Sequence, residues 1–173
     1  MMLHIGCGNV GLLEFTNIDC RQTEATDIVA NAWDLHEIAS DSVEYIYSRH
    51  MLEHLSNSDA ALALLEWRRV LQVGGIVHIV VPNLLFHARQ LLGFLEERQT
   101  ADDEAHAMAG FYGWQNDSHG GMQEDLHRWG YTHESLARLL KSCGLTPTDD
   151  GIEQLIAADD QPWHVNVRAI KER

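Results

Sequence analysis

The sequence predicts an α/β fold, with an open and mostly parallel sheet and helices on both of its faces. Short runs rich in β-branched and aromatic residues alternate along the chain with segments of helical periodicity. One of these runs, residues 76–81, is apolar almost throughout, which is typical of a strand buried on both faces of a parallel sheet. A length of 173 residues suits one domain, and no linker or repeat divides the chain. We therefore expect a single domain over residues 1–173.

The first half of the chain supplies four expected strands and one helix. Only residues 6–14 separate the first two strands, too few for a crossover helix, so we expect a short irregular turn there. A helix is predicted from about Ser58, because apolar residues recur at helical spacing until a glycine pair at 74–75. The four strands are expected at residues 1–5, 15–19, 27–30 and 43–47.

The second half continues the alternation around one irregular stretch. Pro82 closes the strand at 76–81, and an apolar stripe predicts a helix over 84–95. Residues 101–130 lose periodicity and are rich in glycine, so we expect a long loop or lid near the substrate side, with 102–104 as a solvated acidic turn. The remaining expected elements are a helix capped by Thr132 and ended by Gly144, and strands within 145–152 and 164–170.

Charge and composition narrow the classes of partner. Twelve Lys and Arg against 26 Asp and Glu give a net charge of −14, which argues against a nucleic acid or an anionic membrane surface and favours a small or uncharged partner. No apolar run is long enough to span a membrane, and no leader precedes the first motif. Three cysteines without a close pair favour a reducing compartment, so we expect a cytoplasmic protein.

A glycine-rich segment follows the first strand. Residues 6–11 match G-x-G-x-x-G, which fits a structural turn as well as a nucleotide-binding loop. A dinucleotide site places its acidic residue about 20 residues further on, after a helix. Asp19 follows Gly11 by only eight residues. A nucleoside without phosphate fits better, because the Asp19 carboxylate can accept from both ribose hydroxyls. An adenosine cofactor that bears an amino acid meets this requirement.

Four segments in order, 3–9, 17–19, 46–55 and 66–82, resemble class I S-adenosylmethionine-dependent methyltransferases of the type 11 group. The resemblance implies a Rossmann-like, doubly wound sheet of seven strands with an antiparallel last strand, and S-adenosyl-L-methionine as the cofactor. Helices that commonly precede the first strand of this group are missing here. A homodimer that covers this open side is therefore one expected partner arrangement.

The resemblance also implies positions for the cofactor. The glycine loop would face the methionine moiety, Asp19 the ribose, and residues 31–33 the adenine, with Asp34 as the fallback. Ser48 would line the methyl-donor side. The predicted cofactor-binding residues are Gly6, Cys7, Gly8, Asn9, Asp19, Cys20, Asn31, Ala32, Trp33 and Ser48.

Methyl transfer itself needs no metal, and a base is needed only for a hydroxyl or a protonated amine acceptor. His50 is the first candidate base because it follows a strand, and His127 is the second. The eleven histidines are scattered without evident convergence, so no metal site is predicted. The acceptor is expected to be a small molecule or a saccharide-type metabolite, by analogy with this group.

Three alternatives remain open. The domain could bind S-adenosylmethionine without catalysis, as a regulatory or interaction module. His50 to His54 spell H-x-x-E-H, the signature of inverted zinc peptidases, although in the methyltransferase interpretation Glu53 and His54 are mostly structural. A NAD-dependent dehydrogenase is the third alternative, from the glycine motif alone.

Overall fold

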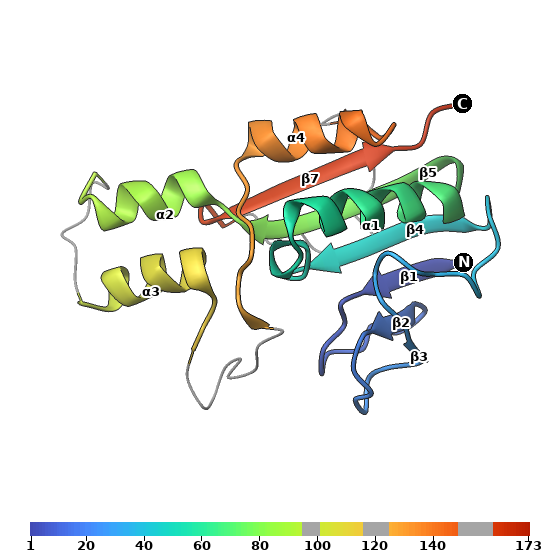
Figure 1. Ribbon diagram of the computed structural model, residues 1–173, viewed down its shortest axis with the longest axis horizontal. Coiled ribbons are helices and arrows are strands. Elements are labelled where there is room, and N and C mark those ends of the chain that lie inside the picture. The colour runs from blue at the N-terminus through green and yellow to red at the C-terminus, as the bar shows by residue number, and fades with distance from the viewer. Residues whose placement is uncertain (95–100, 116–124, 149–160) are drawn as a thin grey trace.

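Seven strands form one mixed sheet in the order β3-β2-β1-β4-β5-β7-β6 (Figure 1). The computed structural model describes residues 1–94, 101–115, 125–148 and 161–173. The first five strands pair in parallel, whereas β7 runs antiparallel to both β5 and β6, which confirms the fold expected from the sequence. The strands are β1 (Met2–Ile5), β2 (Thr16–Asp19), β3 (Ile28–Val29), β4 (Val43–Arg49), β5 (Leu71–Pro82), β6 (Thr146–Thr148) and β7 (His164–Ile170).

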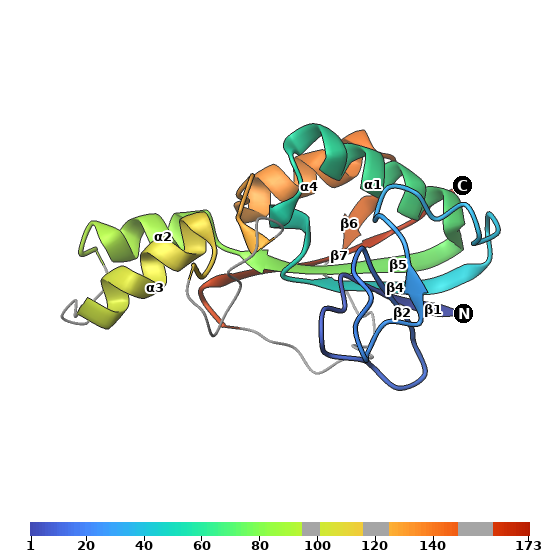
Figure 2. The same cartoon turned by 60° about the horizontal axis from the view of Figure 1, so that its bottom comes forward.

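Two long helices, α1 (Asn57–Val70) and α4 (His133–Ser142), cover the same face of the sheet (Figure 2). The predicted cap of α4 is confirmed, since the Thr132 hydroxyl accepts from Ser135 N at 3.2 Å and the Ser135 hydroxyl accepts from Thr132 N at 2.8 Å. In the described parts of the chain, no helix combines the length and the apolar character that crossing a lipid bilayer requires.

The sequence predicts helices on both faces of the sheet, but on the opposite face this expectation is not met. The connections after β1 and β2 are irregular and too short for a crossover helix, so residues 1–94 place none there. Polar aromatic side chains occupy this face instead. His78 links Tyr45 to Asn166, because its Nδ1 lies 2.7 Å from the Tyr45 hydroxyl and its Nε2 lies 2.7 Å from Asn166 Oδ1.

The core beneath α1 also fixes the loop that follows β3. Trp67 is completely buried, and its indole nitrogen donates to the carbonyl oxygen of Ala32 at 2.9 Å. A tryptophan in the core requires such a partner for its N–H. The bond holds the chain between β3 and β4 against α1, at the edge of the site described below.

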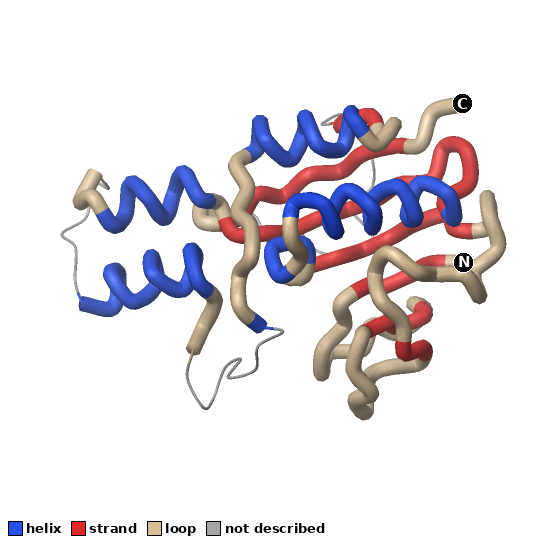
Figure 3. Tube along the Cα trace, viewed as in Figure 1, coloured by secondary structure: helices blue, strands red, loops and turns tan. Residues whose placement is uncertain are grey.

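The expected loop or lid over residues 101–130 is wrong for its first part, because Ala101–Tyr112 form a helix, α3. This helix lies beside α2 (Leu84–Leu91), and the two extend beyond the end of the sheet (Figures 1 and 3). The acidic residues 102–104 form the first turn of α3 rather than a solvated loop, a position favoured by the helix dipole. At Gly110 a Cβ atom would overlap the His87 ring, so the glycine allows close packing of the two helices. Residues 116–124 lie outside the described residues.

Candidate functional site

The glycine loop turns sharply at the carboxyl end of β1. Gly6 and Gly8 have φ angles of +78° and +53°, in the left-handed region that favours glycine. The amides of Gly6 and Cys7 both donate to the carbonyl oxygen of Ile18, at 2.8 and 3.1 Å, which ties the loop to β2. A Cβ atom on Gly6 would overlap the side chain of Met51. The loop therefore passes close to the segment that follows β4.

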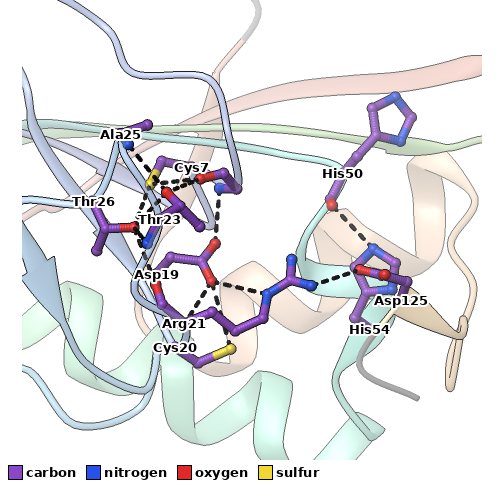
Figure 4. A network of polar contacts seen from close by, with 11 residues as sticks. Cys7, Asp19, Cys20, Arg21, Thr23, Ala25, Thr26, His50, His54 and Asp125 are labelled. Atoms are coloured by element: carbon purple, nitrogen blue, oxygen red, sulfur yellow. Dashed lines mark hydrogen bonds and ion pairs between the residues drawn. The ribbon is translucent and has the colours of Figure 1, made fainter. Parts of the chain in front are cut away.

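Asp19 ends β2 and faces this loop (Figure 4). Its Oδ2 accepts from the Gly8 amide at 2.8 Å, and its Oδ1 accepts from the Arg21 amide at 3.0 Å. The Arg21 guanidinium lies between two carboxylates, with Nε 3.6 Å from Asp19 Oδ1 and a terminal nitrogen 3.5 Å from Asp125 Oδ1. Backbone and side-chain donors thus hold the Asp19 carboxylate in one orientation.

These residues line a cavity of about 270 Å³, which we call the glycine-loop cavity. Its walls come from the carboxyl ends of β1 to β4, where ligands of open α/β sheets bind. Most of the predicted cofactor-binding residues meet there. They are Gly6, Gly8, Asp19, Cys20, Asn31, Ala32 and Trp33.

Three predicted residues lie outside this cavity wall. The thiol of Cys7 is buried 3.8 Å from the Thr26 hydroxyl, Ser48 is buried, and Asn9 is exposed. Asp34, the fallback residue, pairs with His36 at 3.0 Å instead. The sequence analysis missed Arg21, Met51, Leu55, Asp125 and Arg128, which also line the cavity. Asp125 and Arg128 could not be found from motif spacing because only folding brings them to this end of the sheet.

His50 follows β4 and has a φ angle of +50°, which is rare for a residue with a side chain. Its Nδ1 lies 3.2 Å from Oε1 of Glu53, whose side chain is 1% exposed. A carboxylate only accepts, so Nδ1 carries the proton and Nε2 is the acceptor nitrogen of the ring. That Nε2 accepts from Nε2 of His164 at 3.0 Å. The sequence analysis did not identify Glu53 as the partner of His50.

A second cavity of about 250 Å³ lies beside the first, and we call it the histidine cavity. Among the described residues, His50 is the one side chain shared by the two cavities. The expectation that the histidines do not converge is therefore wrong, since the end of β4, α2, α3 and the start of β7 bring them together. The histidine cavity is lined by His50, His87, His106, His127 and His164, with Trp114 and Trp163.

Comparison with known proteins agrees with this geometry. The sequence model of a methyltransferase domain matches residues 3–79. No significant match was found among curated protein sequences. In solved structures, a methyltransferase from Thermotoga maritima is similar with a TM-score of 0.61 and 13% identity, over 99% of this chain and 82% of that one. A methyltransferase from Mesorhizobium loti has a TM-score of 0.59 and 16% identity, over 98% and 89% of the two chains.

A third solved structure contains ligands. The 1,6-didemethyltoxoflavin-N1-methyltransferase of Burkholderia thailandensis, bound to its substrate and to S-adenosylhomocysteine, has a TM-score of 0.61 and 13% identity, over 99% of this chain and 71% of that one. At such identities the structural matches establish the fold, and the domain model matches the part of the chain that contains the glycine loop. The chain has the fold of the class I S-adenosylmethionine-dependent methyltransferases, and its residues 3–79 match a methyltransferase domain. These similarities indicate S-adenosylmethionine as the cofactor.

The protein does not have the arrangement of an inverted zinc peptidase. That signature requires both histidines on one helical face, but only Leu52–His54 form a short 3-10 helix, and His50 precedes it in a left-handed conformation. The Nε2 atom of His54 faces the carbonyl oxygen of His50 at 3.1 Å. Likewise, no helix starts behind the glycine loop, so the pyrophosphate site of a dehydrogenase is not formed.

Three potential metal ligands of the protein lie close together. The Glu53 carboxylate and ring nitrogens of His54 and His127 are within 4.8 Å of one another. Both nitrogens of His54 face carbonyl oxygens, Nδ1 that of Leu126 at 3.3 Å and Nε2 that of His50. The absence of a metal stays a prediction.

Proposed function

We propose that this protein is an active enzyme that transfers the methyl group of S-adenosylmethionine to a hydroxyl or amine acceptor, with His50 as the general base. One observation supports this most strongly: His50 lines both the glycine-loop cavity and the histidine cavity. The cofactor would occupy the first and the acceptor the second. A base at that junction is within reach of the acceptor atom that receives the methyl group.

In the proposed cofactor site, different residues of the glycine-loop cavity bind the ribose, the adenine and the methionine moiety. Asp19 accepts hydrogen bonds from the ribose hydroxyls, since its carboxylate is already held at the cavity wall. Trp33 and Asn31 line the cavity, and we expect them to contact the adenine by stacking and by hydrogen bonding. The guanidinium groups of Arg21 and Arg128 can bind the carboxylate of the methionine moiety.

The proposed reaction is an in-line displacement. The acceptor oxygen or nitrogen attacks the methyl carbon, the bond from carbon to sulfur breaks, and S-adenosylhomocysteine leaves as a neutral thioether. The acceptor proton passes to Nε2 of His50, which gives up its hydrogen bond from His164 to receive it, and the Glu53 carboxylate stabilises the imidazolium that forms. Holding the two reactants in line supplies much of the acceleration.

The backbone at His50 supports a functional role for this residue. Left-handed φ angles in residues with side chains cost about 1 kcal/mol or more and persist where the surroundings fix them. The His50 amide donates to the carbonyl oxygen of Val80 at 2.8 Å, and its ring is held by Glu53. The strained conformation directs the ring toward the junction of the cavities.

We further propose a cytoplasmic location and a homodimer that covers the site. Cys7, Cys20 and Cys143 are all free thiols, as a reducing compartment favours. Leu13 in the connection after β1 is 93% exposed, and a second copy of the chain could bury it. Sedimentation of the purified protein tests the homodimer.

The experiment that tests the function compares wild type with His50→Ala. Labelled S-adenosylmethionine is incubated with fractionated small-molecule extract, and S-adenosylhomocysteine binding is measured by calorimetry. We expect His50→Ala to lower methyl transfer by about 100-fold while binding stays unchanged. His36→Ala, a change at an exposed histidine, is the control. Binding without transfer by wild type would favour a non-catalytic module, and equal loss of transfer and binding in His50→Ala would argue against a base.

A further inference from the structure

The described residues that line the histidine cavity include no side chain of fixed charge, since none of them is Lys, Arg, Asp or Glu. Its polar groups are imidazole rings, and its larger apolar surfaces are two tryptophans. A charged ligand would lose its hydration here without gaining an opposite charge in return.

Three of the imidazole rings of the histidine cavity, those of His87, His106 and His127, are neutral at physiological pH. Burial lowers the pKa of His87 to about 4, with a further contribution from neighbouring His106. Burial also lowers the pKa of His106 and of His127. Neutral imidazole offers one donor and one acceptor, which suits hydroxyl groups rather than ions.

His87 is the residue whose bonding is incomplete. Its side chain is buried, with 2% of the residue exposed, and it lines the cavity. A hydrogen bond to Gln90 raises its pKa, so the ring donates in that bond. In the described part of the chain its Nδ1 has no hydrogen-bond partner. A ring that donates through the other nitrogen leaves Nδ1 as an unpaired acceptor, and such a buried group is costly unless a ligand supplies a donor.

Two aromatic rings complete the wall. Trp163 packs edge-on against His106, with ring centroids 5.5 Å apart and an interplanar angle of 90°. Trp114 lies at the end of α3 and is 46% exposed, so part of its surface is available to a ligand. Flat aromatic walls favour a ligand that is itself a ring.

We propose that the histidine cavity binds the methyl acceptor, and that this acceptor is an uncharged ring compound with hydroxyl groups, one of which donates to Nδ1 of His87. This rests on the proposed function, because the acceptor must also place its reacting group at His50. A sugar ring and a phenol share this chemistry. The lack of fixed charge among the described lining residues argues against uronic acids, amino sugars and other ionic rings as good ligands.

Ligand-observed NMR on protein saturated with S-adenosylhomocysteine tests the proposal. Four sets of probes of equal size are compared: methyl pyranosides, phenols, anionic rings (uronates and benzoates) and cationic rings (amino sugars and benzylamines). We expect binding from at least one uncharged set and none from the ionic sets. His87→Leu should weaken that binding by about tenfold, and Trp114→Ala should weaken it as well. His36→Leu, at an exposed site, is the matched control.

Each outcome decides the question. Binding of methyl pyranosides would identify the acceptor as a sugar, and binding of phenols would identify it as a phenol. Preferential binding of ionic rings, binding unchanged in both cavity variants, or no binding by any uncharged ring would overturn the proposal. Trp114→Ala keeps the test valid if His87→Leu does not fold, because Trp114 is partly exposed. Binding is read without methyl transfer, so an inactive protein that binds uncharged rings would reject the proposed function alone.

Discussion

The Nδ1 atom of His50 lies 3.2 Å from Oε1 of Glu53, a carboxylate whose side chain is only 1% exposed. Burial alone would raise the pKa of Glu53, but the hydrogen bond from His50 and the electrostatic interactions with His54, His50 and His127 outweigh it and hold the pKa below its ordinary value. The carboxylate is therefore ionised at neutral pH. It fixes the His50 tautomer, with the Nε2 lone pair directed away from Glu53 and toward His164.

The first prediction follows from that pair. Glu53→Gln keeps the size of the side chain but removes the charge that stabilises the His50 imidazolium. We expect the rate of methyl transfer to fall by about 100-fold and its pH dependence to change, while S-adenosylhomocysteine binding stays the same. Turnover is measured across pH with the acceptor fraction that wild type methylates.

A conservative variant separates positioning from folding. Glu53→Asp retains the charge and should recover part of the lost activity. If Glu53→Gln and Glu53→Asp were equally inactive and both lowered the melting temperature alike, Glu53 would be a structural residue only.

The second prediction concerns the ribose. Asp19→Asn removes a charged acceptor that lines the glycine-loop cavity. Hydrogen bonds to a charged group contribute more than neutral ones, so we expect the Kd of S-adenosylhomocysteine to rise about 10- to 100-fold by calorimetry. Asp34→Asn is the matched control, since Asp34 pairs with exposed His36 outside the cavity. A larger effect in Asp34→Asn than in Asp19→Asn would mean that the cofactor lies elsewhere.

Local sequence signals were sufficient for the sheet and for much of the glycine-loop cavity. The strands have strong β-forming runs, and their carboxyl ends meet at one edge of a parallel sheet by geometry alone. Gly6, Asp19 and Ala32 could therefore be placed together from the order of the strands. The residues at the carboxyl ends of β1 to β4 are close in space because those strands are neighbours.

The histidine cavity could not be predicted in the same way. His50 and His164 are 114 positions apart in sequence, and no local pattern links them. The helix α3 was missed because its inner face consists of small residues, such as Ala107 and Gly110, rather than of a large apolar stripe. Close packing against α2 stabilises it, and that contact depends on tertiary structure.

The third prediction separates steric overlap from backbone strain in the glycine loop. Both Gly6 and Gly8 have positive φ angles, but a Cβ atom on Gly6 would overlap Met51, whereas one on Gly8 has no neighbour within 4 Å. We expect Gly8→Ala to lower the free energy of unfolding by about 1–2 kcal/mol, from strain alone. Gly6→Ala should lower it by roughly 2–5 kcal/mol, because overpacking adds to the strain. Urea denaturation of both variants measures the difference, and equal losses would contradict the overlap.

The last prediction uses the buried imidazole of His87. Burial, and then the neighbouring His106, lower its pKa to about 4 in the folded protein, below the ordinary 6.5 of the unfolded chain. As pH falls through that interval, the unfolded state binds a proton at His87 and the folded state does not, so folding becomes less favourable. Between about pH 7.5 and about pH 5 this one group should lower the free energy of unfolding by about 2 kcal/mol.

His87→Leu removes the titrating ring and should lose correspondingly less stability over the same pH interval, whatever its stability at neutral pH. The buried Glu53 does not obscure the comparison, because its pKa is held below the ordinary 4.5 and it stays ionised at both pH values. Urea titrations of wild type and variant at each pH supply the four free energies that are needed. Parallel losses in the two proteins would mean that His87 is protonated in the folded state, with an ordinary pKa and access to solvent.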